Sequence, residues 1–233
     1  MMIIKTLATG STGNCYYISD GITSILIEAG IPFKKIQRKL DFETSSLAGC
    51  LISHEHLDHC KAIEDVAKAG IDIYLSLGTK EALGATGHRL KTIEAKQPFT
   101  LGTLTIMPFE VEHDVSEPLG FLIASKNGDK LLFASDTYFV RYRFKGLTHI
   151  MVECNYSEDI LDRNISTGRT HKAQKKRLLR SHFSLDNVKE FLLANDLSKV
   201  QEIWLLHLSD SNSDEERFKR EVQEVTGKVV YVP

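Results

Sequence analysis

The feature that most constrains the fold is the segment 53–61, which reads SHEHLDHCK. It follows the apolar run 50–52, which predicts a buried strand. Residues two apart cannot share a helix face, so we expect an extended loop that spreads the first two histidines, with the last donors at the mouth of a helix beginning near Lys61. Imidazole and carboxylate ligands suit zinc or a similar divalent ion. The candidate ligands in this segment are His54, His56, Asp58 and His59.

Further donors are expected elsewhere, because one catalytic ion needs only three protein ligands and an open position. They follow three later apolar runs: His113 after 104–111, Asp136 after 130–134, and His207 after 202–206. Side chains at strand ends can converge at one edge of a sheet. We therefore predict a site for two ions, with Asp136 placed to bridge them.

The remaining pattern predicts several strands followed by helices in each half of the chain, which suits an α/β sandwich of two sheets with helices outside. We expect one domain covering residues 1–233. Ser213 and Glu216 form a capping box for a last helix that ends near Val225. Strands are predicted at 3–7, 15–18, 22–27, 50–52, 71–75, 104–111, 119–125, 130–134, 150–153, 202–206 and 229–232, and other helices at 33–40, 61–69 and 78–83.

The composition is that of an ordinary globular protein, with 42% hydrophobic and 26% charged residues. The formal net charge of −2 means that an anionic substrate must be held by a local patch. There is no apolar run long enough for a membrane span and no secretion signal, so we expect a cytoplasmic protein. The cysteines are widely spaced, and we expect reduced thiols in the core: Cys15, Cys50, Cys60 and Cys154.

The HxHxDH motif, a later histidine, a strand-ending aspartate and a last histidine together resemble the metallo-β-lactamase fold over nearly the whole chain. This resemblance implies an αββα sandwich, in which two mixed sheets carry helices on their outer faces. The segments TGSTGNCYY, EHDVSEPLGF, MVECNYSEDIL and SHFSLDNV resemble the YycJ/WalJ exonucleases, of the phosphodiesterase branch that also contains RNase Z and RNase J. Phage-encoded anti-Pycsar enzymes, which hydrolyse cyclic pyrimidine mononucleotides, are similar too.

The resemblance implies that two divalent ions are bound, Zn²⁺ in the first place and Mn²⁺ as the alternative. His54, His56 and His113 would hold one ion. Asp58, His59 and His207 would hold the other, and Asp136 would lie between them. The chain departs from the family at Glu28, where an aspartate is usual. That longer carboxylate would have to reach a ligand histidine differently.

Two such ions activate a shared water, and the resulting hydroxide would attack the phosphorus of a phosphodiester. Asp58 could align this nucleophile. His182 is expected to contact phosphate and to help protonate the leaving oxygen. His182 also competes with His207 as the last ligand, and we favour His207 because it directly follows an apolar strand. Glu153 and Asn155 are placed to support the site from a neighbouring strand end.

Other substrate contacts are expected from Ser11 and Asn14 in the loop GSTGN, and from Arg180. Arg180 ends the basic segment 163–180, which could steer a phosphate-bearing substrate. A solvated helix face explains that segment equally well, and in a homodimer it could cover the pocket of a second subunit. A tight turn between two strands likewise explains the GSTGN loop as well as phosphate binding does.

The expected substrate is a nucleotide or nucleic-acid phosphodiester. The short chain, without a large inserted domain, favours a small cyclic nucleotide, and a DNA or RNA exonuclease is the alternative. A non-catalytic metal-binding module is the weakest hypothesis, because a structural zinc site is closed by four ligands.

Overall fold

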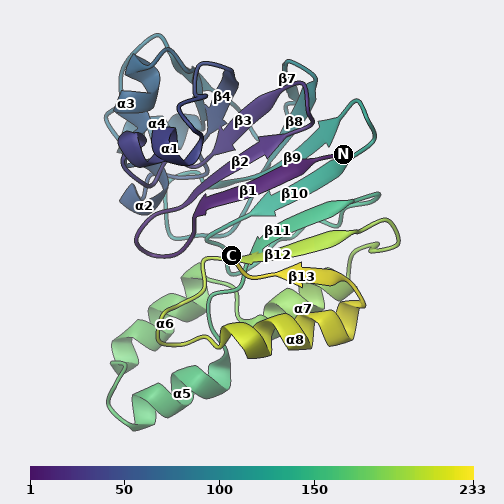
Figure 1. Cartoon of the computed structure of the whole chain (residues 1–233). Coiled ribbons are helices and arrows are strands. Elements are labelled where there is room, and N and C mark those ends of the chain that lie inside the picture. The colour runs from purple at the N-terminus through teal and green to yellow at the C-terminus, as the bar shows by residue number, and fades with distance from the viewer. The chain divides into compact units, whose positions relative to one another are not determined.

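The computed structural model describes residues 1–233, apart from the side chains of residues 172–174 (Figure 1). The chain divides into two compact units. The first unit comprises Met1–Glu110 and Val115–Asp129, and the second comprises Val111–Asp114 and Lys130–Pro233. The strands belong to two sheets, one of six and one of seven strands.

The first unit contains the whole six-stranded sheet, in the order β1-β2-β3-β4-β5-β6. Its first two pairings are antiparallel and its last three are parallel. An antiparallel ladder of β7, β8 and β9 belongs to the same unit. The elements are β1 (Ile3–Ala8), β2 (Cys15–Ser19), β3 (Ser24–Ile27), α1 (Phe33–Lys39), β4 (Leu47–Leu51), α2 (Leu57–Cys60), α3 (Ile63–Lys68), β5 (Ile73–Leu75), α4 (Leu77–Ala82), β6 (Leu90–Thr92), β7 (Phe99–Leu101), β8 (Leu104–Glu110) and β9 (Leu119–Ser125).

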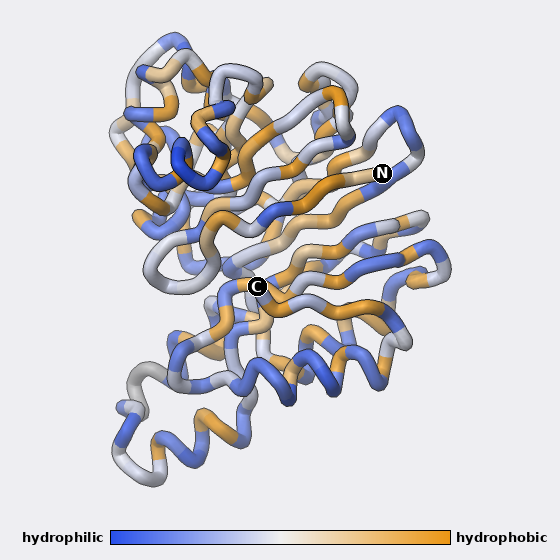
Figure 2. Tube along the Cα trace, in the orientation of Figure 1, coloured by the Kyte–Doolittle hydropathy of each residue, from blue (hydrophilic) through white to orange (hydrophobic). Residues whose placement is uncertain are grey.

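One apolar core holds α1 and α3 in this unit. Ile36 of α1 and Val66 of α3 are fully buried in the same cluster as Leu26 and Ile73 of the sheet. Burying each such side chain stabilises the folded state by about 1.5–3 kcal/mol. Figure 2 shows the strands as mainly hydrophobic, whereas α1 carries a hydrophilic outer face. All four cysteines are buried and free, so the prediction of reduced core thiols is confirmed.

The second unit is built on a parallel ladder of β10, β11, β12 and β13. Helices connect β11 to β12 and β12 to β13, and α8 packs against both α7 and β13 (Figure 1). The elements are β10 (Lys130–Ala134), β11 (His149–Glu153), α5 (Glu158–Ser166), α6 (Lys172–Ser181), α7 (Leu185–Leu193), β12 (Glu202–Leu206), α8 (Glu215–Thr226) and β13 (Val229–Tyr231). No helix among the described residues combines the length and the apolar character that crossing a membrane requires.

The parallel register brings the carboxyl ends of neighbouring strands to one edge of each ladder. Ala134 pairs with Val152, and Glu153 pairs with Leu206. Asp136 and His207, which follow β10 and β12, have left-handed backbones with φ of 47° and 52°. In the first unit Glu28, directly after β3, has φ of 64°. A non-glycine residue in this region is strained, and such residues concentrate at functional sites.

The structure differs from the local predictions in three places. The helix expected at 61–69 is present as α3, but a separate short helix α2 precedes it, because the amide of Ala62 leaves the helical pattern and donates to the carbonyl of Ala29 (2.8 Å). The last helix is capped by Asp214, which accepts from the amide of Arg217 (3.0 Å), and not by Ser213. The short strands β6 and β7 were not predicted, since three residues carry little periodic signal.

Gly30 provides a stability test of how this fold positions the ligand helix α2. A Cβ at Gly30 would lie 1.7 Å from the carbonyl O of Asp58, so an added methyl must displace the backbone of a predicted ligand. We expect Gly30→Ala to lower the free energy of unfolding by about 2–3 kcal/mol. Urea denaturation measures this change.

Gly84→Ala is the matched control, because Gly84 has φ of 57° and open space around its Cβ position. Only backbone strain of about 1 kcal/mol is expected there. Equal losses in the two variants would contradict the close packing of Gly30 against Asp58.

Candidate metal centre

The first-unit donor cluster consists of His54, His56, Asp58 and His59. The Nε2 of His54 lies 3.1 Å from the Nδ1 of His56, and the His54 and His59 rings are 4.1 Å apart between centroids. Two imidazole nitrogens bound to one tetrahedral zinc would lie about 3.3 Å apart, given Zn–N lengths near 2.0–2.1 Å. His54 and His59 are buried, while His56 and Asp58 are half-buried. The cluster is therefore convergent and open to solvent on one side.

Glu28 and Asn14 fix the position of His59. Its Nδ1 lies 3.4 Å from Oε1 of Glu28, whose Oε2 accepts from the amide of Ser53 (3.4 Å). Its Nε2 lies 3.1 Å from the side-chain amide of Asn14. Glu28 is fully buried, and this 3.4 Å contact shows that its longer side chain lies beside His59, a predicted ligand.

Backbone hydrogen bonds hold α2 against the loop that follows β3. The amide of Ala29 donates to the carbonyl of His59 (2.7 Å), and the amide of Asn14 donates to the carbonyl of Asp58 (2.7 Å). Asp58 and His59 lie inside this short helix, with His56 in an extended conformation before it. Asp58 and His59 thus lie on a helix whose backbone carbonyls accept hydrogen bonds from two separate segments of the chain.

The second-unit donor cluster consists of His113, Asp136, His182 and His207. Asp136 Oδ1 lies 2.8 Å from Nδ1 of His207. The His182 ring is 5.7 Å from that of His113 and 5.6 Å from that of His207. Glu153 joins these residues, because ligand atoms of Asp136, Glu153, His182 and His207 all lie within 4.8 Å of one another.

Glu153 at the end of β11 organises this second cluster. Its side chain is fully buried and Oε1 accepts hydrogen bonds from the Nδ1 atoms of both His182 and His207. Its Oε2 accepts from the backbone amides of Thr137 (2.9 Å) and Phe183 (3.3 Å). Asn155, also expected to support the site, donates to the carbonyl of His207 (2.8 Å).

The charges around Glu153 set the protonation of both histidines. Burial alone lowers the pKa of His207, but Asp136 and then Glu153 outweigh it and raise that pKa to about 10. Burial likewise opposes the protonation of His182, yet the Glu153 carboxylate raises the pKa of His182 above its ordinary value. A divalent ion must displace such protons, so metal binding should weaken as the pH falls.

His113 is oriented by the end of α6. Its Nδ1 donates to the carbonyl of Ser181 (3.0 Å), and the hydroxyl of Ser181 donates to Asp114 (2.9 Å). A backbone acceptor of this kind fixes the tautomer and direction of a metal-binding imidazole. No sequence signal singled out Ser181, because the contact depends on tertiary structure.

The predicted substrate residues have different surroundings. Ser11 and Arg180 are exposed. Asn14 is fully buried, and its side chain contacts Gly10, Tyr16, Asp58 and His59. This burial favours a positioning role for Asn14 over substrate binding. In the segment 163–180, Lys175 pairs with Asp162, and the side chain of Lys172 lies outside the described residues.

Both clusters fit divalent metal ions chemically. Imidazole and carboxylate donors together suit zinc and similar ions. Asp136 and Glu153 are buried like charges, and Asp136 raises the pKa of Glu153 against the stronger lowering by His182. A bound cation would relieve this repulsion, since an opposite charge nearby favours the ionised form of both carboxylates.

Comparison with protein families gives one match that covers most of the chain. The model described as "Beta-lactamase superfamily domain" matches residues 23–207. This range contains every residue of the two donor clusters.

Two relatives are similar along nearly their whole length. The chain is 28% identical to the exodeoxyribonuclease YycJ of Bacillus anthracis, over 95% of this chain and 88% of that protein. It is 29% identical to the exodeoxyribonuclease WalJ of Streptococcus pneumoniae, over 90% of this chain and 82% of that protein.

Among solved structures, the metallo-β-lactamase fold protein YhfI from Bacillus subtilis is similar, with a TM-score of 0.75. The match covers 100% of this chain and 95% of that protein, at 16% identity. At this identity the likeness shows the fold alone.

The hydrogen bonds of Glu153 predict its effect on metal binding. Glu153→Gln keeps the shape of the side chain but removes the charge that orients His182 and His207. We expect the affinity for Zn²⁺ to fall by about 10–100-fold, as measured by isothermal titration calorimetry. Glu221→Gln, which removes an ion-paired carboxylate from α8, should bind zinc as the wild type does. Unchanged affinity in Glu153→Gln would show that Glu153 does not orient the ligands.

Proposed function

The chain belongs to the β-lactamase superfamily, and we propose that it is a metal-dependent phosphodiesterase that removes nucleotides from DNA. The predicted metallo-β-lactamase fold, with two mixed sheets and helices, is confirmed. The chain is a metal-dependent hydrolase of that fold. The proposal therefore concerns the substrate and the arrangement of the metal ligands.

DNA is supported by the two relatives, both named exodeoxyribonucleases and both matched over most of their length. The sequence alone favoured a small cyclic nucleotide, as in the anti-Pycsar enzymes, because the chain is short. We place DNA first, because similarity over the whole chain outweighs an argument from length. The cyclic nucleotide becomes an outcome that the substrate assay can detect.

We assign the donors to two ions. His54, His56 and His113 would hold one ion, and Asp58, His59 and His207 the other, with Asp136 shared. The observation that carries this assignment is that each unit holds a compact, largely buried cluster of imidazoles and carboxylates. His207 is preferred to His182 because its side chain is 5% exposed, against 16% for His182. Divalent ions in such a site polarise the phosphoryl oxygens and lower the pKa of water.

The residues of this chain would then orient and protonate the reactants. Asp58 is half-buried and its carboxylate can accept a hydrogen bond from the attacking water, which aligns that water with phosphorus. His182, whose Nδ1 donates to Glu153, would donate from its other ring nitrogen to a non-bridging phosphate oxygen. As the P–O bond breaks, His182 can pass a proton to the departing sugar oxygen.

A substrate panel tests the proposed function. Protein loaded with Zn²⁺ or Mn²⁺ is assayed on single- and double-stranded DNA, RNA, cyclic mononucleotides and bis(p-nitrophenyl) phosphate. We expect the wild-type protein to release nucleotides from DNA ends. The variants His56→Ala and Asp136→Asn should lose bound metal, and their rate should fall by at least about 100-fold. Hydrolysis of cyclic nucleotides without DNA would replace this proposal by the alternative.

His88→Ala is the control for these variants, because His88 is exposed and lies outside both clusters. It should keep its metal and its rate. Full activity with both ions bound in Asp136→Asn would contradict the ligand assignment.

The role given to His182 predicts a variant that separates metal binding from turnover. His182→Ala should retain both ions, because His182 is not assigned as a ligand, and kcat should fall by about 100-fold or more. Metal content by mass spectrometry and steady-state kinetics measure the two effects. Loss of an ion from this variant would mean that His182, and not His207, is the last ligand.

A further inference from the structure

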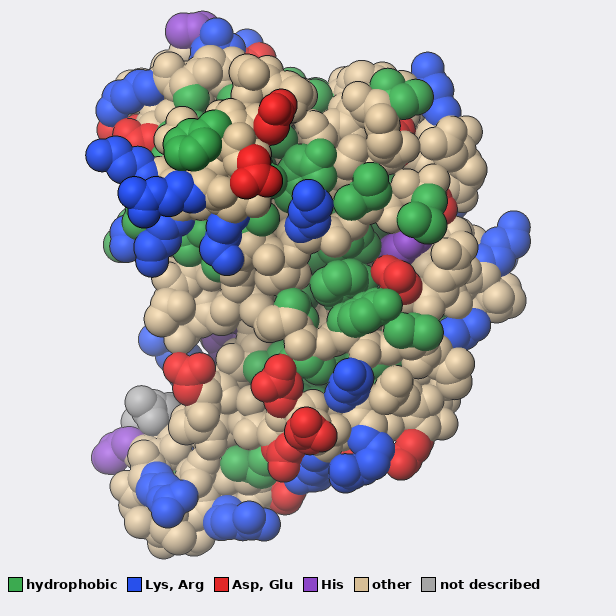
Figure 3. Space-filling model, in the orientation of Figure 1, with side chains coloured by type: hydrophobic (Ala, Val, Ile, Leu, Met, Phe, Trp, Pro, Cys, Tyr) green, Lys and Arg blue, Asp and Glu red, His purple; other side chains and the backbone are tan. Residues whose placement is uncertain are grey.

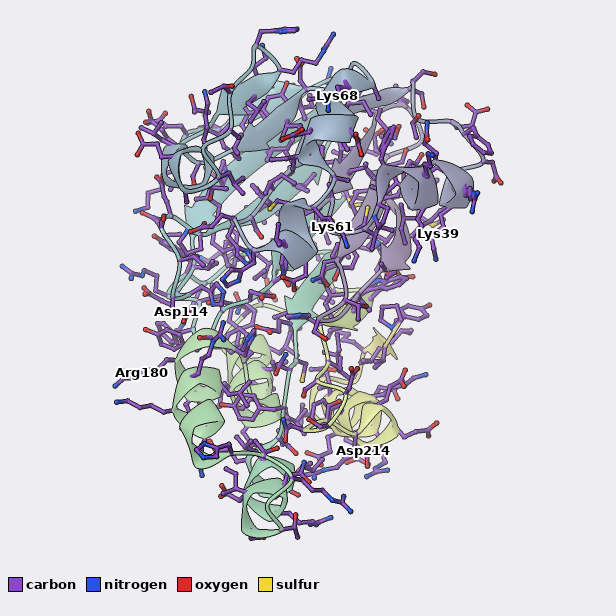
Figure 4. All side chains as sticks on the ribbon, turned by 90° about the vertical axis from the view of Figure 1, so that its left-hand side faces the viewer. Lys39, Lys61, Lys68, Asp114, Arg180 and Asp214 are labelled. Atoms are coloured by element: carbon purple, nitrogen blue, oxygen red, sulfur yellow. The ribbon has the colours of Figure 1, made fainter. Side chains whose placement is uncertain are left out.

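The outer face of α1 forms a concentrated basic surface on the first unit. The helix reads FKKIQRK: Phe33 and Ile36 are buried, and the basic residues point outward. Figure 3 shows Lys and Arg side chains gathered over α1 and α2, and Figure 4 shows Lys39 and Lys61 on the same side of this unit. The α1 basic surface is defined as the exposed residues Lys34, Lys35, Arg38, Lys39 and Lys61.

These five cations are not neutralised within the described part of the chain, where none of them forms an ion pair or a side-chain hydrogen bond. Some other cations are paired: Lys68 pairs with Glu64, and Lys175 pairs with Asp162. Because the whole chain has a net charge of −2, five exposed cations on and beside one short helix are a local concentration of positive charge.

The stability of the helix explains only part of this charge, because Arg38 and Lys39 lie in the last turn, where the helix dipole favours cations. Lys34 and Lys35 stand in the first turn, where the helix dipole disfavours cations and where α1 has no acidic residue. The pairs Lys34–Arg38 and Lys35–Lys39 are like charges four residues apart, which also destabilises a helix. Residues that work against the helix they occupy are better explained by a ligand than by folding.

The surface is connected to the first-unit donor cluster through the backbone. The loop from Glu28 to Pro32 joins the residue that supports His59 to the start of α1. The amide of Ala29 binds the carbonyl of His59. Lys61 follows α2 directly, two residues after His59. The α1 basic surface therefore lies on the unit that carries the first-unit donor cluster and is joined to it by a short loop.

We propose that the α1 basic surface binds the phosphate backbone of DNA beyond the nucleotide being removed. This inference rests on the proposed function, and it identifies the substrate as a polynucleotide rather than a mononucleotide. The seven-residue helix is about 10 Å long. DNA carries a phosphate about every 3.4 Å along each strand, so several phosphates lie within reach of these cations.

Salt-dependent binding tests the proposal. The neutral variant carries Lys34→Gln, Lys35→Gln, Arg38→Gln and Lys39→Gln. Zinc-loaded protein is titrated with a single-stranded phosphorothioate 20-mer, which resists cleavage, and fluorescence anisotropy gives Kd over a range of salt concentrations. Four lost phosphate contacts should reduce the slope of log K against log salt by about 3 and weaken binding at least about tenfold at 100 mM salt.

Two controls separate local contact from net charge and from misfolding. Lys126→Gln, Lys145→Gln, Lys199→Gln and Lys219→Gln remove the same charge from exposed positions elsewhere and should leave the slope unchanged. A charge-conserving variant with Lys34→Arg, Lys35→Arg, Arg38→Lys and Lys39→Arg should bind as the wild type does. An unchanged slope in the neutral variant, or an equal loss in the scattered control, would overturn the proposal.

The result is distinguishable from failure of the proposed function. If the wild-type protein binds the 20-mer through α1 but cleaves no DNA, the α1 basic surface is supported and the exonuclease function is contradicted. If the wild-type protein cleaves DNA and the neutral variant binds the 20-mer normally, only the α1 proposal is contradicted. Binding to vesicles of phosphatidylglycerol and phosphatidylcholine is measured in the same way. If the neutral variant loses binding to these vesicles but still binds the 20-mer as the wild type does, α1 is a membrane-binding surface and the DNA proposal is overturned.

Discussion

Two buried carboxylates lie against three histidines of the donor clusters: Glu28 against His59, and Glu153 against His182 and His207. Each carboxylate is itself fixed by backbone amides: Glu28 by the amide of Ser53, and Glu153 by those of Thr137 and Phe183. The fold therefore sets the direction of each carboxylate, and Glu153 sets the direction of two imidazoles through hydrogen bonds. Hydrogen bonds to a charged group contribute about 1.5–3 kcal/mol each, so the arrangement around Glu153 is both stable and specific.

The same edges of the sheets carry backbone strain. Glu28, Asp136 and His207 each follow a strand and each adopt a left-handed conformation. Such conformations cost about 1–3 kcal/mol each and persist only where surrounding structure enforces them. Here β3 is buried along its whole length, β10 is buried apart from its first residue, and the last two residues of β12 are buried. The strain thus occurs where the chain leaves a buried strand end and places a polar residue in or beside a donor cluster.

The sequence was sufficient for the fold class, which the family model and the fold comparison confirm. Its assignment of metal ligands stays a prediction, drawn from donors that lie within the SHEHLDHCK segment or shortly after an apolar run. The sequence was insufficient wherever tertiary contacts decide. Asn14 was expected to meet substrate, yet its side chain is fully buried beside His59 and its side-chain amide donates to the carbonyl of Asp58 (3.3 Å). The break between α2 and α3 depends on the carbonyl of Ala29. The basic segment 163–180 attracted attention by composition, whereas the charge on α1 became informative only once its lack of ion partners among the described residues was known.

The central claim is that histidines from two clusters, far apart in the sequence, hold a single pair of divalent ions. Anomalous diffraction from crystals of the zinc-loaded protein, measured at the zinc edge, tests it most directly. The expected result is two peaks about 3.5–4 Å apart, one bound by His54, His56 and His113 and the other by Asp58, His59 and His207, with Asp136 touching both. A single peak, or separate peaks each closed by four ligands from one cluster, would contradict the claim.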